Sequence, residues 1–437
     1  SVCQNYNYGI KPSCFDGTIT NNTEFPDMKA YGNTSFHNSK TARIIHKSLV
    51  MLGVVLCMCI VLCSFCLYTV AYADDTDISA SVSESSSEIR DAILSTFDYG
   101  EIDNSLKELF PDAQVKFEDV LSEILSGDLK HSFRLLGTFA KEQCVYLLQM
   151  EKKTLIYIVM IAMIAAVMNQ FTGILQNRQV AGIGFYIIYL MLIALTITAF
   201  DVVLSKVEAG ILAVTGFMSV FCPVYFLAVA VAKGSVTSVA FYNLMLFLIY
   251  GVELIIGKIL LPVVRVYMMI RVLNFLTPEE MFEKFSELLA LIVKWTLRTA
   301  LACVIGVNLI QGMISPAIDT VRRSAVTKGA EAIPGVGNLL GGMTEVAIGT
   351  AVLVKNGIGM AGALICIALC TLPLIQIAAT ELLYKMTAVM IQPVSDDRVI
   401  GCVEAVAEGC GLLLQMVFTV GLLFLLTIAI VAALTGN

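Results

Sequence analysis

The chain has few charged residues and very few histidines or tryptophans. Charged residues make up 14% of its 437 residues, against about 25% in typical soluble domains. It contains 3 histidines and 1 tryptophan. So little charge excludes an ordinary soluble enzyme, and three scattered histidines argue against a histidine-based metal centre or catalytic triad. We therefore expect no enzymatic activity and no catalytic, metal-binding or cofactor-binding residues.

The balance of charge and the cysteines exclude two further classes. Twenty-eight basic residues against 35 acidic ones give a net charge of −7, so no nucleic-acid partner is expected. The 13 cysteines form no framework. Cys63 and Cys66 have CxxC spacing, but they lie in an apolar run, which favours buried small side chains over redox or metal chemistry.

Long apolar runs are what the sequence does have. Hydrophobic residues make up 57% of the chain, its mean hydropathy is +0.82, and whole windows of about 20 residues lack any charge. This pattern predicts an all-α polytopic membrane protein. About seven transmembrane helices are expected, at Leu155–Ile174, Phe185–Leu204, Leu212–Ala232, Val239–Val264, Trp295–Ile314, Ile358–Ala379 and Leu412–Leu434.

The N-terminal part divides into three regions ahead of the transmembrane domain, 154–437. Residues 1–42 are polar and aperiodic, which indicates a disordered tail or a mis-called N-terminal extension. Residues 43–73 carry a basic start, an apolar run and small residues at a cleavage position, so they are typical of a signal peptide, with an uncleaved anchor as the alternative. Residues 74–153 show short amphipathic helical patterns. We expect them to form a small extracytoplasmic helical region.

A glycine-rich segment, Arg322–Gly362, is the most unusual part of the chain. Nine glycines, a proline and an acidic residue interrupt its apolar pattern, which favours a broken or re-entrant membrane segment that packs closely against other helices. Part of it matches GxGxxG, but no βαβ unit surrounds the match, so dinucleotide binding is dismissed. The candidate packing or conduit residues are Arg322, Arg323, Lys328, Pro334, Gly335, Gly337, Gly341, Gly342, Glu345, Lys355, Asn356, Gly357, Gly359 and Gly362.

Glu253 is the clearest ionisable group inside an expected span. Such groups are candidates for function by default, although an interhelical hydrogen bond or an interfacial position is the commoner role. Lys258 lies five residues further on, which on an α-helix is a different face, so no local ion pair is expected between them.

Three blocks of sequence resemble one known family. They are AIPGVGNLLGGMTEVAIGTAVLVKNGIGMAG within the segment 318–362, YKMTAVMIQPVSDDRVIGCVEAVAEG at 384–409, and the C-terminal FTVGLLFLLTIAIVAALTGN. Together with the order of signal, acidic helical region and polytopic body, they resemble the stage III sporulation protein AE family of endospore-forming bacteria. The resemblance covers about residues 74–437 and leaves out the N-terminal tail.

The resemblance implies a membrane subunit of the channel between mother cell and forespore, which is needed for forespore development. It implies as partners the other stage III A proteins, among them a secretion-type ATPase and ring-forming proteins, and stage II sporulation protein Q. It also implies a multi-pass location in the mother-cell membrane around the forespore. A homo-oligomer is kept as a separate alternative for the assembly state. The alternative hypothesis is a stand-alone secondary transporter for a small solute, which predicts inverted repeats that the sequence does not show.

Overall fold

The fold is known from a computed structural model. It describes residues 97–109, 116–126, 178–232, 235–275, 282–330, 337–393 and 395–434, with a few positions between 156 and 164. The N-terminal extension (1–42), the signal peptide (43–73) and most of the expected span Leu155–Ile174 lie outside these residues. Only a small part of the expected extracytoplasmic region, 74–153, is described.

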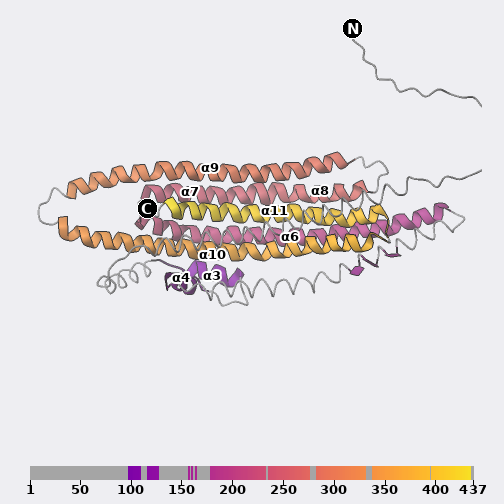
Figure 1. The fold of residues 1–437 in the computed structure, drawn as a ribbon, viewed down its shortest axis with the longest axis horizontal. Coiled ribbons are helices and arrows are strands. Elements are labelled where there is room, and N and C mark those ends of the chain that lie inside the picture. Colours follow the sequence, from indigo (N-terminus) through magenta and orange to yellow (C-terminus); the bar gives the residue numbers. More distant parts are fainter. Residues whose placement is uncertain are drawn as a thin grey trace, which may run out of the picture. The chain divides into compact units, whose positions relative to one another are not determined.

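The described residues form helices and contain no strand, which confirms the all-α polytopic class. Two short amphipathic helices precede a series of long ones (Figure 1). The elements are α3 (Gly100–Leu109), α4 (Phe117–Ser126), α6 (Arg178–Ala232), α7 (Ser235–Gly251), the π-helix η1 (Val252–Leu260), α8 (Leu261–Asn274), α9 (Glu283–Ala330), α10 (Gly337–Ile391) and α11 (Asp397–Leu434).

Five helical stretches among the described residues are long and apolar enough to cross a membrane. Several of them are much longer than a crossing needs. At about 1.5 Å per residue, the 55 residues of α6 extend over about 80 Å, whereas the hydrocarbon core of a bilayer is about 30 Å thick. The stretches are Tyr186–Ala232, Ser238–Asn274, Glu283–Ile310, Gly349–Ile391 and Asp397–Ala433.

Two spans that the sequence analysis separated belong to one helix. Phe185–Leu204 and Leu212–Ala232 both lie within α6, which continues through the polar stretch between them. That stretch carries Lys206 and Glu208, with Asp201 just before it, and it contains one glycine, Gly210, but no proline; a single internal glycine lowers helix stability without breaking the backbone hydrogen-bond pattern. Charge interrupted the hydropathy pattern without interrupting the helix.

The glycine-rich segment is also helical where it is described. Its first residues end α9 at Ala330, and from Gly337 onward it forms the start of α10, so Gly341, Gly342 and Glu345 lie in a continuous helix. Residues 331–336, between the two helices, lie outside the described residues. Each internal glycine costs about 1 kcal/mol of helix stability relative to alanine, but glycine is frequent in membrane helices because it allows close packing. Pro334 and Gly335 lie outside the described residues.

Helices α10 and α11 form the centre of the described bundle. About two thirds of the most apolar window of each is buried, compared with 17% for α9. They pack against each other and against α6, and α11 also contacts α8 and α9 (Figure 1). One large apolar core runs through these helices and extends into α3 and α4.

Candidate functional site

A seam of glycines on α10 receives aromatic side chains from α6. A Cβ built on Gly359 would lie 2.9 Å from the ring of Tyr225, and one built on Gly362 would overlap the ring of Phe221. The two aromatic rings stack on each other with centroids 5.4 Å apart. Three of the predicted motif residues, Gly357, Gly359 and Gly362, therefore act together as a packing surface, which is the role that small residues have between membrane helices.

Gly357, the remaining glycine of this seam, contacts α4. A Cβ on Gly357 would lie 2.9 Å from Cδ2 of Leu125, and Phe117, at the start of α4, lies 6.3 Å from Phe221 between ring centroids. Tyr99 stacks on Phe117 at 5.3 Å. Burial, and secondarily the carboxylate of Glu118, raise the pKa of Tyr99 to about 12. The short N-terminal helices are thus part of the same packed core as the spans.

Two polar residues of the predicted motif are buried beside the seam. Lys355 is fully buried, and the side-chain oxygen of Asn356 is buried without a hydrogen-bond partner among the described residues. The hydroxyl of Tyr225, also buried, has no such partner there either. Unsatisfied buried polar atoms are costly, by about 1–3 kcal/mol each. The seam therefore combines close packing with polar groups that retain hydrogen-bonding capacity.

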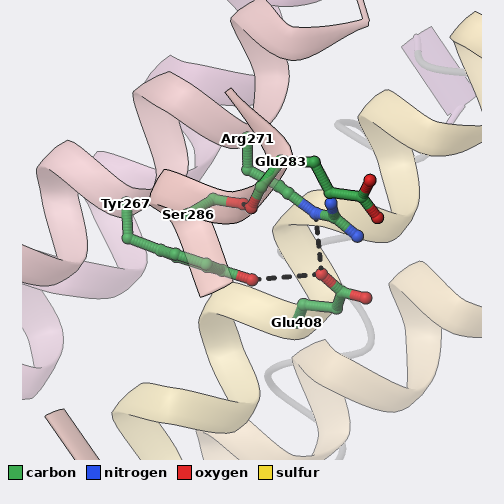
Figure 2. A network of polar contacts seen from close by, with 5 residues as sticks. All are labelled: Tyr267, Arg271, Glu283, Ser286 and Glu408. Atoms are coloured by element: carbon green, nitrogen blue, oxygen red, sulfur yellow. Dashed lines mark hydrogen bonds and ion pairs between the residues drawn. The ribbon is translucent and has the colours of Figure 1, made fainter. Parts of the chain in front are cut away.

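A second polar group joins α8 to α11. Figure 2 shows Tyr267 and Arg271 pointing toward Glu408: the Tyr267 hydroxyl donates to Oε2 over 3.1 Å, and Nε of Arg271 donates to the same oxygen over 3.1 Å. Glu283, at the start of α9, lies on the other side of the guanidinium (Figure 2). Arg271 also lies over the ring of Phe275, 5.8 Å from its centroid. This network connects α8 to α11, with the start of α9 beside it.

Two more ion pairs lie on the described spans. Arg265 of α8 contacts Asp201 of α6, with 3.0 Å between Nε and Oδ1, and both side chains are about half exposed. Lys385 contacts Glu381 within α10 at 2.5 Å, and both are largely buried. With the Arg271 network, these pairs make a charged set that involves α6, α8, α10 and α11, in which oppositely charged side chains satisfy one another on otherwise apolar helices.

Smaller polar contacts complete the interior. The Asn308 amide of α9 donates to Oγ1 of Thr427 on α11 over 3.2 Å, and both residues are buried. A cavity between α6 and α10 has a volume of about 10 Å³, which is about the room that one water molecule needs. Its lining residues are Val203, Lys206, Pro373, Gln376, Ile377 and Thr380.

The remaining predicted residues are placed only in part. Arg322, Arg323 and Lys328 lie in the last turns of α9; their side chains, like that of Glu345, are outside the described set. Glu253 is exposed on η1 instead of facing the bundle interior. The structure therefore joins Lys355 through Gly362 in one site and leaves Glu253 apart from it.

Sequence reasoning missed the most connected charged residues. Arg271 and Glu408 are 137 positions apart, so no local spacing links them. Lys385, by contrast, follows Glu381 by four residues, an i,i+4 spacing that predicts a pair on one helix face. Of the two pairs, only the second leaves a signal in the sequence.

The described residues contain no group of histidine, cysteine or carboxylate side chains that could hold a metal ion. Long apolar helices, a close-packed glycine seam and internally paired charges define a multi-pass α-helical membrane protein. A family model described as "Stage III sporulation protein AE" matches residues 115–435. The chain belongs to the stage III sporulation protein AE family.

A curated relative agrees with this assignment. The chain is 24% identical over 374 residues to the stage III sporulation protein AE of Bacillus subtilis (strain 168), which covers 84% of this chain and 92% of the relative. No solved structure matches the chain.

Proposed function

We propose that this protein is a non-enzymatic integral membrane subunit of a sporulation-specific transport or channel assembly that links mother cell and forespore and is required for forespore development. Membership of the family over residues 115–435 is the observation that carries the proposal. The close packing at Gly357, Gly359 and Gly362 supports it, because tightly packed helices suit a structural subunit of an assembly. This role does not require any residue to catalyse a reaction.

The glycine-rich segment is proposed as the packing or conduit element of that assembly. Gly337, Gly341 and Gly342 lie in α10, about four to six turns before the seam at Gly357–Gly362. The same small-residue chemistry that admits Phe221 at Gly362 would admit a partner helix at Gly341 and Gly342. Arg322, Arg323 and Lys328 are proposed as the polar mouth of the element, with Glu345 and Lys355 as its internal charges.

Substitution at these glycines tests the role. Gly341→Leu and Gly342→Leu are expected to abolish sporulation and co-purification of the assembly, because a large side chain blocks close helix approach, while membrane insertion is unchanged. Gly349→Leu is the matched control on the same helix, since a Cβ there meets nothing within 4 Å. Normal spore yield from the Gly341 and Gly342 variants would refute the role of the motif.

The proposed location and partners need a separate experiment. The protein is proposed to lie in the mother-cell membrane around the forespore, with residues 74–153 extracytoplasmic. Its proposed partners are the other stage III A proteins and stage II sporulation protein Q. A fluorescent fusion followed through sporulation should concentrate at the engulfing septum, and affinity purification from that stage should recover these partners. Uniform fluorescence in growing cells would contradict the proposal.

A stand-alone secondary transporter for a small solute is the alternative function. A stand-alone transporter, purified and reconstituted by itself, would move solute across the membrane of liposomes. Among the described residues, the cavity between α6 and α10 has a volume of about 10 Å³, which is room for about one water molecule, so this cavity itself does not hold a solute. Solute uptake by the purified chain in liposomes would favour this alternative over the subunit.

A further inference from the structure

The π-helix η1 carries an acid and a base on its outer surface. Glu253 and Lys258 are both exposed, in a stretch whose other residues are apolar or glycine. The large side chains exposed nearby on the same continuous helix are also apolar: Phe247 is 71% exposed, Tyr250 62% and Ile259 51%. Two opposite charges thus lie on a surface that is otherwise suited to lipid or to another apolar helix.

The geometry of η1 brings these two residues to one side. On an α-helix, positions five apart face different directions, because a turn takes 3.6 residues. In a π-helix the hydrogen bond joins residue i to residue i+5, as the N–H of Leu261 does with the carbonyl of Ile256. Glu253 and Lys258 have that spacing, so η1 stacks them one above the other. Five positions apart, they lie nearer to one side on η1 than on the α-helix that the sequence predicts, and, as expected, no ion pair joins them.

Neither charge has an ion-pair partner among the described residues, which distinguishes them from Arg265, Arg271 and Lys385. Ionisable side chains within spans are costly and are normally paired or turned inward. π-Helical turns are rare and often mark functional positions. An exposed acid and base at a π-helix in an apolar span therefore need a partner that offers the opposite charges at the same spacing.

We propose that η1 forms a contact between two copies of this chain, in which Glu253 of each copy pairs with Lys258 of the other. Copies in one membrane share their orientation, so a two-fold axis along the membrane normal makes the two pairs reciprocal. This contact is additional to the proposed function, and it does not depend on the passage of a cargo.

Charge reversal in the full-length protein tests the contact. The chain is purified in detergent, and its dimer fraction is measured by light scattering and by energy transfer between two labelled populations in liposomes. Glu253→Lys and Lys258→Glu are each expected to weaken self-association by about tenfold or more, because like charges then meet across the interface. The double variant E253K/K258E should restore it. Lys294→Glu, an exposed reversal on α9, serves as the control and should change nothing.

A mixing experiment identifies the partner. Glu253→Lys gives a copy with two bases at this site and Lys258→Glu one with two acids, so the two variants should associate with each other although neither associates with itself. The thermal midpoint of each variant establishes that the fold is retained. A wild-type protein that stays monomeric, or variants that fail to associate when mixed, would overturn the proposal and leave another protein or lipid as the occupant.

Discussion

The ring of Phe221 occupies the space that a side chain at Gly362 would need. The relationship recurs elsewhere in the bundle: the ring of Phe275 fills the position of a Cβ on Gly401, and the ring of Phe200 lies 2.6 Å from that of a Cβ on Gly409. Apolar tails of lipid do not drive helices together as water does, so fitted packing supplies much of the association energy. Paired glycines and aromatic rings are one form of that fit.

Substitution of Gly362 by alanine should therefore destabilise the protein. The new methyl group would force the Phe221 ring out of its position, and overpacking of this kind costs about 1–3 kcal/mol. The thermal midpoint in detergent is the measurement. Gly349→Ala on the same helix, where the added Cβ is free of contacts, should leave the midpoint unchanged or raise it. Equal midpoints for both variants would show that the seam tolerates the methyl group.

The pair of Arg271 and Glu408 should contribute more to stability than the pair of Arg265 and Asp201. The Arg271 side chain is 23% exposed, against 52% for Arg265, and solvent screens the more exposed pair. Double-mutant cycles with glutamine and asparagine substitutions should give a coupling of about 1 kcal/mol for the first pair and less for the second. A larger coupling at Arg265 would reverse this ranking of the two contacts.

Removal of one partner from the buried pair Glu381 and Lys385 should destabilise the protein more than removal of both. Glu381→Leu leaves an unpaired lysine, and breaking a buried pair costs about 3–5 kcal/mol, whereas an apolar replacement of both partners can be neutral. The double variant E381L/K385M should therefore unfold at a higher temperature than either single variant. If the decreases in unfolding temperature of the two single variants simply add in the double variant, the two charges are not coupled.

The short helix α4 should detach when its contact with α10 is lost. Leu121 is buried, and one of its methyl carbons lies 3.2 Å from the position of a Cβ on Gly357, so Leu121→Asp buries a charge that has no partner. Hydrogen exchange of the amides of α4 should accelerate in this variant. Ser122→Asp, at an exposed neighbouring position, should leave exchange unchanged. Slow exchange in both variants would mean that other contacts hold α4.

The composition was sufficient to predict the class of protein, because long uncharged runs of apolar residues are typical of helices that cross a lipid bilayer. It was less informative about where helices end. Hydropathy divided α6 at Asp201–Glu208 because charges lower the average there, but the backbone needs only residues that tolerate helical geometry. A single helix such as α6 can therefore contain two apolar runs.

The candidate site was predictable only in its residue types. Glycines in the pattern of Gly357, Gly359 and Gly362 indicate close approach, but the sequence does not say what approaches; the structure shows α4 at the first and α6 at the other two. Nor does periodicity reveal the π-helix, because η1 lies within a run of apolar residues that predicts an ordinary α-helix. Without it, Glu253 and Lys258 are assigned to different faces.

Exposed apolar side chains occur on α6 from Ile183 to Val231, a distance of about 70 Å along the helix axis. A hydrocarbon layer about 30 Å thick cannot shield that whole length, even with the helix tilted by about 40°. Protein surfaces must therefore shelter the remainder from water. In the purified chain we expect detergent to cover that remainder, and neighbouring protein to replace the detergent in the membrane.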